Sequence, residues 1–401
     1  MSRFDGPLAG VVVLDLSRAL AGPHAGMMLG DLGARVIKVE SPGTGDDTRG
    51  WGPPFVGEPD ALESTYFLSC NRNKESIALN LKDPDDRDVL DALIGDADVL
   101  VENFRTGVMD RLGYSNDRLL ELNPRLVILS ITGFGHDGPE GGRPGYDQIA
   151  QGEAGIMSIT GSGPDDPQRV GVPIGDLLSG IYGAYGVVAA LHERTSTGRG
   201  GVVRTSLLSA LVGVHAFQGT RQTVADETPR AQGNHHPSIA PYGLFACADG
   251  AVQISVGSPQ LWQRFCDRFG IDPQGDGIAT NAERVANRAA VIAIVEAAFS
   301  AYDADDLLSE LEAAGIPAGK VRSLDEVYAW DQVASQGLRV DVEHSVLGSL
   351  TLPGPPLRFF GDGGDAEEEV TFRAHRAPPT LDEHGQAIRD AVARRARAVA
   401  S

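Results

Sequence analysis

The sequence predicts an α/β fold built on a parallel sheet. Short apolar segments alternate with helical segments through the first half of the chain, which is typical of βαβ units. The clearest unit has a strand at 10–16, a helix that follows Ala21-Gly22-Pro23 and stops at Gly33, and a strand at 35–40. Because 401 residues are too many for one ordinary core, we expect two domains.

The same alternation continues to residue 204. Further strands are expected at 76–81, 98–101, 126–131 and 201–204, and helices from 84 to 94 and at 109–112, 117–122, 175–192 and 207–218. These strands are apolar nearly throughout, as strands of a parallel sheet covered on both faces must be. The strand at 98–101 is followed directly by polar residues, and ligands of open α/β sheets bind at such carboxyl ends.

The character of the chain changes near residue 226. A loop at 229–241 precedes an alternating strand at 251–256 and an amphipathic helix at 262–269. Two more helices are expected at 287–302 and 304–314. Residues 226–325 therefore read as a small α/β domain, and strand-like pieces return from 326 before a polar helical tail.

Composition argues against several classes of function. The net charge is 34 − 55 = −21, which is unfavourable for binding nucleic acid or an anionic membrane. The three scattered cysteines lack metal-ligand spacing, so we expect no metal and a reducing compartment. We find no signal peptide and no apolar run near the ~20 residues that span a bilayer. The expectation is a soluble, cytoplasmic protein.

Residues 133–138 read Gly-Phe-Gly-His-Asp-Gly, which has the spacing of a dinucleotide-binding fingerprint. That fingerprint requires a helix that opens on its last glycine. Pro139 and several glycines follow instead. A nicotinamide-dependent oxidoreductase is therefore disfavoured.

Asp176 lies in the first turn of the glycine-rich helix expected at 175–192. An acid at this position ordinarily satisfies free backbone N–H groups and the helix dipole. A carboxylate held at the mouth of a rigid helix can also act as a nucleophile. The residues alone leave both roles open.

Six short motifs occur together with a characteristic spacing: Ala21-Gly22-Pro23, Leu29–Ala34, Val36–Glu40, Asn71–Lys74, Val101–Phe104 and Gly145-Tyr146-Asp147. In this arrangement the chain resembles the class III CoA-transferases, a family that includes formyl-CoA and carnitine CoA-transferases and the 2-methylacyl-CoA racemases. The resemblance covers the whole chain, most strongly residues 8–210. It implies a Rossmann-like large domain at 1–205 completed by 326–401, a linker helix at 206–225, a small domain at 226–325 and an interlocked homodimer.

The resemblance also implies that Asp176 is the catalytic aspartate. In a transferase, this carboxylate attacks the thioester of an acyl-CoA donor and forms a mixed anhydride and CoA thiolate. The thiolate then attacks the aspartyl carbonyl, and the resulting aspartyl-CoA thioester reacts with the acceptor acid. CoA enters as a substrate, and no permanently bound cofactor or metal is needed.

CoA carries several phosphates, so its site should be cationic despite the acidic total. Each Arg or Lys taken singly is more often a solvated surface charge, but placement at strand ends and next to loops favours a binding role. Matches to the family, with Arg105 and Arg143 as neighbours, give the expected CoA-binding set: Leu79, Lys82, Asn103, Phe104, Arg105, Arg111, Arg143 and Tyr146.

Within the family, the choice lies between a transferase and a racemase. The racemases have a histidine in place of Tyr146 and keep an aspartate in place of Asp176. A phenol with a reference pKa of about 10 is a poor base at neutral pH, so Tyr146 favours the transferase. We expect His136 to be a surface loop residue. A non-catalytic CoA-binding protein is disfavoured because the chain keeps Asp176 and Asn103-Phe104.

The acids exchanged are suggested by the loops. Formyl-CoA transferases that use oxalate have a glutamine where this chain has Leu20, and a tetraglycine loop where it has residues 233–242. Residues 45–49, 51–55 and 238–242 instead resemble the branch that uses succinyl-CoA and dicarboxylates, such as succinate–hydroxymethylglutarate CoA-transferase. A second carboxylate on the substrate would need a cation, which Arg49, His235 or His236 could supply. The two histidines could instead simply stabilise their loop. The expected substrate-loop residues are Leu20, Arg49, Trp51, His235 and His236. One departure from the family is Leu381-Asp382-Glu383-His384-Gly385, which replaces Leu-Gly-Glu-His-Thr.

Overall fold

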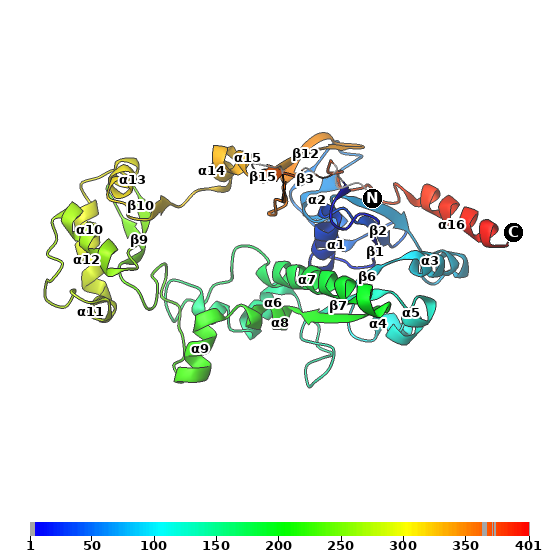
Figure 1. Cartoon of the computed structure of the whole chain (residues 1–401), viewed down its shortest axis with the longest axis horizontal. Coiled ribbons are helices and arrows are strands. Elements are labelled where there is room, and N and C mark those ends of the chain that lie inside the picture. Colours follow the sequence, from blue (N-terminus) through cyan, green and yellow to red (C-terminus); the bar gives the residue numbers. More distant parts are fainter. Residues whose placement is uncertain (1–4, 363–366, 371, 373, 401) are drawn as a thin grey trace. The chain divides into compact units, whose positions relative to one another are not determined.

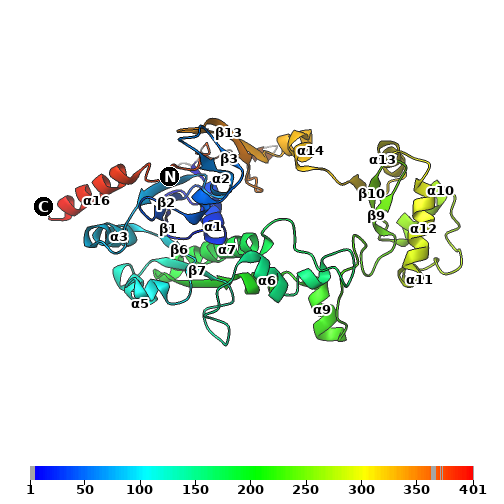
Figure 2. The ribbon, with the colours of Figure 1, turned by 180° about the vertical axis from the view of Figure 1, so that it is seen from behind.

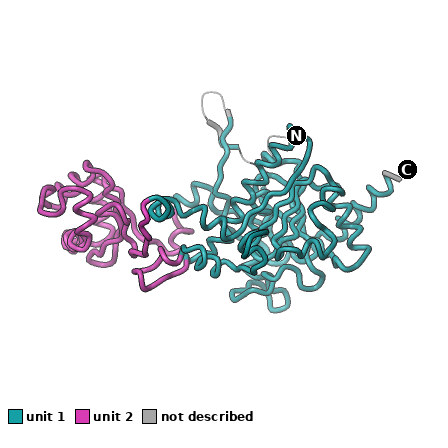
Figure 3. Tube along the Cα trace, turned by 90° about the horizontal axis from the view of Figure 1, so that it is seen from below, with its two compact units in different colours: residues 1–156, 170–224, 331–401 teal, residues 157–169, 225–330 magenta. Residues whose placement is uncertain are grey.

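The computed structural model describes residues 5–362, 367–370, 372 and 374–400. They form two compact units (Figure 3): Met1–Ile156, Val170–Val224 and Asp331–Ser401 make unit 1, and Met157–Arg169 and Ala225–Trp330 make unit 2. The segment predicted as a linker helix forms α8 (Leu207–Gly213) and α9 (Ala216–Ala225), which belong to unit 1 up to Val224.

Unit 1 is built on a six-stranded sheet in the order β5-β2-β1-β6-β7-β8 (Figure 1), and every neighbouring pair is parallel. The strands are β1 (Val12–Asp15), β2 (Arg35–Glu40), β5 (Lys74–Ala78), β6 (Val99–Glu102), β7 (Val127–Thr132) and β8 (Gly201–Ser206). The predicted α/β class and parallel sheet are confirmed. The direction of strand addition reverses between β1 and β6, and in open α/β sheets such a reversal opens a crevice at the carboxyl ends.

Alternate residues of the strands face two apolar cores. Val13 and Leu129 pack on one face with α1 (Ala21–Asp31) and α7 (Ile174–Thr197). Leu14 and Ile128 pack on the other face, which α3 (Pro84–Asp96), α5 (Asn116–Leu122) and α16 (Gly385–Ala400) cover. Figure 2 shows the arrangement from behind. The period of two in each strand thus produces a three-layer unit.

Helix α7 is long and apolar enough, by length and composition, to cross a membrane. The expectation that no apolar run approaches this length was therefore wrong for α7. Its buried residues, including Gly183 and Val187, pack against α1 and β7. This packing explains an apolar composition in the core of unit 1.

The approach of α1 to α7 depends on glycine. A Cβ at Gly180 would lie 2.7 Å from the carbonyl oxygen of Ala21, and a Cβ at Gly183 would lie 2.9 Å from the side chain of Leu129. Gly95 in α3 contrasts with both, since a Cβ there would have no neighbour within 4 Å. The small residues at the start of α7 therefore set its distance from α1 and the sheet.

The C-terminal segment of unit 1 covers the outer edge of β5. The backbone N–H of Asn73 donates to the carbonyl of Arg376, and that of His384 donates to the carbonyl of Ser76. The N–H of Ala78 donates to Oδ1 of Asp382 at 2.7 Å. The backbone polar groups at this edge of the sheet thereby find hydrogen-bond partners within the same chain.

The departure from the family pattern at 381–385 has a structural reason. Asp382 has φ +61°, the left-handed region in which glycine is preferred. Its carboxylate occupies the space beside residue 385, where a Cβ would lie 1.9 Å from Oδ1. The glycine at 385 therefore makes room for the aspartate at 382.

The remaining elements of unit 1 are short. They are η2 (Asp47–Gly50), β3 (Phe55–Val56), β4 (Glu63–Ser64), α2 (Thr65–Ser69), α4 (Val108–Arg111), α6 (Asp147–Glu153), α15 (Asp331–Ser335), β12 (Arg339–His344), β13 (Gly348–Pro353), β14 (Phe360–Asp362) and β15 (Glu367–Glu369).

Unit 2 contains an antiparallel sheet in the order β11-β10-β9. Its core is rich in aromatic rings, with Phe265 and Phe299 both fully buried. The elements are η3 (Met157–Ile159), β9 (Tyr242–Ala246), β10 (Ala251–Ser255), α10 (Pro259–Phe269), α11 (Asn281–Ala286), α12 (Arg288–Phe299), α13 (Ala304–Ala313), β11 (Ala318–Lys320) and α14 (Leu324–Ala329).

Candidate active site

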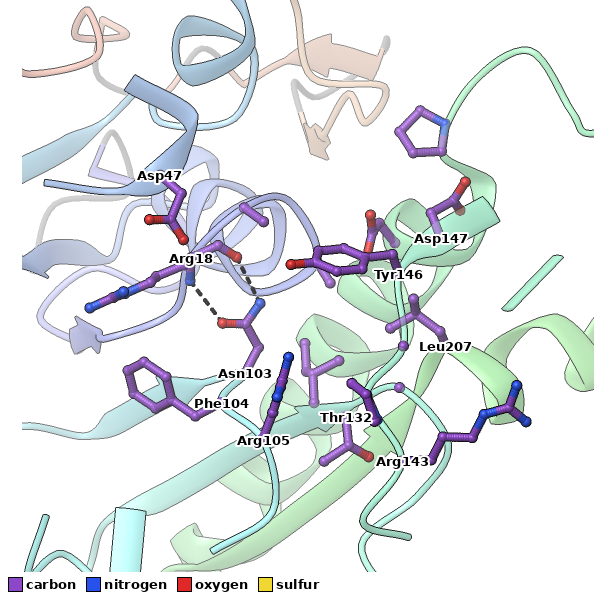
Figure 4. Close-up of a pocket in the computed structure, with 18 of the residues that line it drawn as sticks. Arg18, Asp47, Asn103, Phe104, Arg105, Thr132, Arg143, Tyr146, Asp147 and Leu207 are labelled. Carbon is purple, nitrogen blue, oxygen red and sulfur yellow. Dashed lines mark hydrogen bonds between the residues drawn. The ribbon is translucent and has the colours of Figure 1, made fainter. Parts of the chain in front are cut away.

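A cavity of about 410 Å³ lies at the carboxyl ends of β1, β6 and β7 (Figure 4). Four loops contribute to its wall: residues 18–21 after β1, 47–51 after β2, 103–106 after β6 and 141–146 before α6. Asp176 of α7 lines the same cavity. It is the position at which parallel α/β sheets bind ligands.

Asn103 joins the loops on either side of the strand-order reversal. Its Nδ2 donates to the carbonyl oxygen of Arg18 at 2.7 Å, and the N–H of Arg18 donates to its Oδ1 at 2.8 Å (Figure 4). The guanidinium of Arg18 lies over the ring of Phe104, 5.7 Å from its centre. The amide of Asn103 therefore fixes the spacing between two walls of the cavity.

Two buried lysines hold the loops beside β1 and β2. Lys38 pairs with Asp46 at 2.8 Å, and Lys74 pairs with Asp15 at 2.7 Å. Asp46 also accepts a hydrogen bond from the N–H of Ala19. Burial opposes the charge on Lys38, but the facing carboxylates prevail and raise its pKa above the ordinary value. The loop that carries residues 47–51 is thus anchored beneath the cavity.

Asp176 is a half-buried carboxylate for which the described residues supply no hydrogen bond and no ion pair. The N-terminus of α7 is capped instead by Asp147, whose Oδ1 accepts from the N–H of Gly175 at 2.7 Å. Burial, and then the charge of Asp147, raise the pKa of Asp176 to about 7. The capping role left open for Asp176 is therefore filled by another acid, and Asp176 faces the cavity with an unshared carboxylate.

Tyrosines stand near this carboxylate. Tyr66 lines the cavity, and burial followed by the charge of Asp176 raises its pKa to about 12, so its phenol stays protonated. Trp51 meets Tyr66 edge to face at 5.1 Å. Tyr146 is well exposed, and Figure 4 shows its ring reaching from the start of α6 toward the loop of Arg18. These rings contribute apolar surface to the wall of the cavity.

The cations of the cavity differ in their partners. Arg143 bonds Glu153 at 2.5 Å and lies over the ring of Phe134. Arg105 is exposed and has no ion-pair partner among the described residues. Arg105 is therefore the cation most available to an anionic ligand.

A second cavity, of about 450 Å³, lies at the carboxyl ends of β2 and β5. Leu79 and Lys82 line it, and it shares Arg18 and Phe104 with the first cavity. The predicted CoA-binding residues therefore divide between two adjoining cavities. Arg111, at the end of α4, lines neither of them.

The residues expected in a substrate loop lie in different settings. Trp51 lines the first cavity, whereas Leu20 is buried just before α1. The guanidinium of Arg49 is held by two 2.8 Å hydrogen bonds to Glu40. His235 and His236 belong to unit 2, where they contact Phe245 and Tyr242 respectively. A role of these residues toward substrate stays a prediction.

His136 has a more specific environment than a surface loop. Its Nε2 lies 2.7 Å from Oγ of Ser130, which also bonds the buried Glu102. Burial lowers the pKa of His136, so the ring is neutral at pH 7. After Gly138 no helix begins before Asp147, which agrees with the expectation that the glycine motif is not a dinucleotide fingerprint.

The lining residues that the sequence analysis did not predict include Arg18, Tyr66 and Asp147. Only Asp147 carried a signal, because it ends the motif Gly145-Tyr146-Asp147. In the part of the chain that the structure describes, no group of three or more His, Cys, Asp or Glu side chains could hold a metal ion.

Residues 8–385 match CoA-transferase family III. The chain belongs to this family. The resemblance seen in the short motifs is thereby confirmed, and the protein is an enzyme of the CoA-transferase type.

Individual relatives are similar over nearly their whole length. The chain is 38% identical to human succinyl-CoA:glutarate CoA-transferase, over 94% of this chain and 84% of the relative. It is 37% identical to acetyl-CoA:oxalate CoA-transferase of Acetobacter aceti, over 96% and 95% respectively. Among solved structures, a CAIB/BAIF family protein from Brucella suis aligns with a TM-score of 0.82 at 38% identity, covering 96% of this chain and 99% of that one.

Proposed function

We propose that this transferase moves CoA from an acyl-CoA donor such as succinyl-CoA to a small carboxylic acid, with Asp176 as the covalent nucleophile. The observation that carries the proposal is a half-buried carboxylate, without hydrogen bonds from the described residues, that lines one cavity together with three arginines. A desolvated carboxylate with a pKa near 7 is more nucleophilic when ionised than a solvated one.

The proposed reaction consists of four acyl substitutions. A carboxylate oxygen of Asp176 attacks the thioester carbonyl, the C–S bond breaks, and a mixed anhydride and CoA thiolate result. The thiolate attacks the aspartyl carbonyl and releases the donor acid as its carboxylate. The acceptor carboxylate then attacks the aspartyl-CoA thioester, and the same steps in reverse give the new acyl-CoA and regenerate Asp176.

The two adjoining cavities suggest how CoA would bind. We propose that its nucleotide end occupies the cavity of Leu79 and Lys82, and that its pantetheine arm passes Arg18 and Phe104 to bring the thioester to Asp176. The contacts expected for the phosphates are then Lys82, Arg18 and the more distant Arg111, since guanidinium and ammonium groups bind phosphate strongly.

The acid acceptor is proposed to be a dicarboxylate. The named relatives use glutarate or oxalate at nearly equal identity, so identity alone does not separate the two acids. Leu20, in the place of the glutamine of the oxalate-using branch, favours a longer acid. Arg105 supplies a cation without an ion-pair partner in the described chain, which suits a second carboxylate.

A 2-methylacyl-CoA racemase of the same family is the second candidate. The pKa of Asp176 near 7 would also suit a base that removes a proton beside a thioester. Such a reaction needs a second acid/base group, and Tyr146 stands where the racemases have histidine. This favours the transferase.

The test is intact-protein mass spectrometry after brief incubation with succinyl-CoA. Wild type is expected to gain a CoA- or acyl-sized adduct that hydroxylamine removes, and Asp176→Ala is expected to gain none. Asp47→Asn removes another carboxylate that lines the same cavity and should keep the adduct. An adduct on Asp176→Ala would contradict the proposal, and loss of the α-deuterium of a 2-methylacyl-CoA without any adduct would favour the racemase.

We also propose that the protein acts as an interlocked homodimer in the cytoplasm. Four apolar side chains of α7 are exposed in the single chain, with Tyr185 at 73% and Ile181 at 41%. A partner subunit would cover such a face. Light scattering of the purified protein is expected to give twice the 42.3 kDa of one chain.

A further inference from the structure

Asp147 is bonded on both of its carboxylate oxygens. Oδ1 accepts from the N–H of Gly175, and Oδ2 accepts from Nε2 of Gln151 at 2.7 Å. Gln151 is completely buried and accepts from the N–H of Val170 through its own Oε1. Asp147 is therefore held rigidly between α6 and the first turn of α7.

The hydrogen bond to Gly175 places Asp147 next to the backbone of Asp176, the proposed nucleophile. Gly175 precedes Asp176, so the hydrogen bond from its N–H fixes the backbone from which the Asp176 side chain projects. Both carboxylates line the same cavity, yet only that of Asp147 has hydrogen-bond partners in the described chain. One acid of the pair is fixed in place and the other faces the cavity.

We propose that Asp147 is a positioning residue for the transferase reaction: it caps α7 to orient Asp176, and its negative charge makes the Asp176 carboxylate more basic. The inference rests on the proposed function of Asp176 as the nucleophile. Two like charges held close together disfavour ionisation of the group that lacks stabilising hydrogen bonds. Gly175 and Gln151 donate hydrogen bonds to Asp147 and hold its carboxylate in place.

The other groups around Asp176 act in different ways. Arg18, Arg105 and Arg143 line the cavity with guanidinium groups, and Asp47 lines it with a carboxylate. The side chains of Tyr66 and Tyr146 also line the cavity. From α1, His24 faces α7 at Gly180, and burial lowers its pKa to about 4, so it is neutral above pH 5. Of the two acids that line the cavity with Asp176, Asp147 is the one that accepts a hydrogen bond from α7.

Two variants separate the two roles. Asp147→Asn keeps an oxygen acceptor for Gly175 and removes the charge, whereas Asp147→Ala removes both. In kcat/KM for CoA transfer from succinyl-CoA, the acidic midpoint is expected to fall by ~0.5–1 pH unit in both variants. Asp147→Ala should in addition lose ~10-fold in kcat, because the first turn of α7 is no longer fixed. Asp60→Asn, which changes an exposed acid that lines neither cavity, is the control and should leave the midpoint in place.

An infrared titration of Asp176 gives a readout that does not require activity. The carboxyl stretch is followed against pH in the full-length protein, with Asp176→Asn subtracted. A midpoint that falls in Asp147→Asn supports the inference even if no covalent adduct forms, in which case the proposed function alone fails. An unchanged midpoint in Asp147→Asn by both methods, with an unaltered circular dichroism spectrum, would overturn the inference.

Discussion

Asp176 and Asp15 are both carboxylates removed from water, and their surroundings give them opposite properties. Asp15 is completely buried against Lys74 and Lys38, and these charges outweigh burial and lower its pKa. Asp176 has no such partner among the described residues, and burial raises its pKa to about 7. The chain therefore holds one carboxylate as a fixed anchor of the cavity loops, and another, the proposed nucleophile, without such a partner.

The raised pKa of Asp176 predicts a pH-dependent stability difference. In the unfolded chain its pKa is the ordinary 3.8, and in the folded chain it is about 7. Ionising Asp176 therefore lowers the free energy of unfolding. The loss is absent below pH 4, grows from pH 4 to 7 and is complete above pH 7. Asp176→Asn should be more stable than wild type by about 2–4 kcal/mol at pH 8 and equal to it at pH 4. Urea unfolding at the two pH values measures this, and an equal difference at both would contradict it.

Arg105 allows the dicarboxylate proposal to be tested. Arg105→Gln removes an exposed cavity cation that has no ion-pair partner in the described chain. We expect KM for glutarate to rise ~10-fold while KM for butyrate stays nearly unchanged, because a charge-assisted hydrogen bond contributes about 1.5–3 kcal/mol. Steady-state kinetics with both acids provide the measurement. A rise only in KM for succinyl-CoA would place Arg105 on CoA instead.

For individual residues, the sequence predicted the site residues that lie in recognisable motifs. It missed those that only tertiary packing brings to the cavity. Asp176, Asn103 and Tyr146 lie in recognisable motifs, and all three line the first cavity. Tyr66 reaches that cavity from α2, a helix of five residues that no apolar periodicity announces. The interaction of Asp147 with Gly175 joins residues 28 positions apart, which local pattern cannot reveal.

At the scale of elements, α7 is the helix on which the site depends. It carries Asp176 at its first turn and packs against both α1 and the sheet. Its predicted start at 175 lies within one residue of the observed Ile174, and it extends to Thr197, beyond the predicted 192. The C-terminal turns are polar and exposed, so apolar periodicity ends before the helix does.

Glycine substitutions on helices test this packing. Gly180→Ala would place a methyl group 2.7 Å from the backbone oxygen of Ala21, so α1 and α7 must separate. We expect it to lower stability by about 1–3 kcal/mol and to reduce kcat, because Asp176 lies one turn away. Gly95→Ala in α3 meets nothing within 4 Å and should raise stability by about 0.5–1 kcal/mol. Calorimetry of both variants measures the change in stability. Equal changes would show that the close contact of Gly180 with Ala21 does not restrict the residue at position 180.

At the scale of the whole molecule, the alternation of strands and helices predicted the class of the fold but not how the chain closes it. Arg389 of α16 bonds Asp86 at 2.7 Å and the carbonyl of Ala78, and Ile388 is buried in the core beneath the sheet. The polar helical tail expected from the sequence is α16, which begins at Gly385. These contacts span about 300 residues, and no local pattern of sequence encodes such a distance.

Ile388 provides a test of this closure. Ile388→Ala should lower the stability of the protein by about 2–4 kcal/mol, since it leaves a cavity in a core cluster. Arg394→Ala, exposed on the same helix, should change it by less than about 0.5 kcal/mol. Thermal unfolding of the two variants distinguishes a C-terminal segment that completes unit 1 from one that merely follows it.

The covering of β5 by residues 376–384 has a consequence for biosynthesis. All strands of the parallel sheet have been synthesised once residue 206 has been made. The segment that covers the outer edge of β5 is translated about 300 residues after β5. Unit 2 is made in the interval, and all of its sequence has left the ribosome before that segment emerges. The nascent chain therefore carries an uncovered strand edge while a later unit folds, and this is the stage of synthesis at which a chaperone would protect it from aggregation.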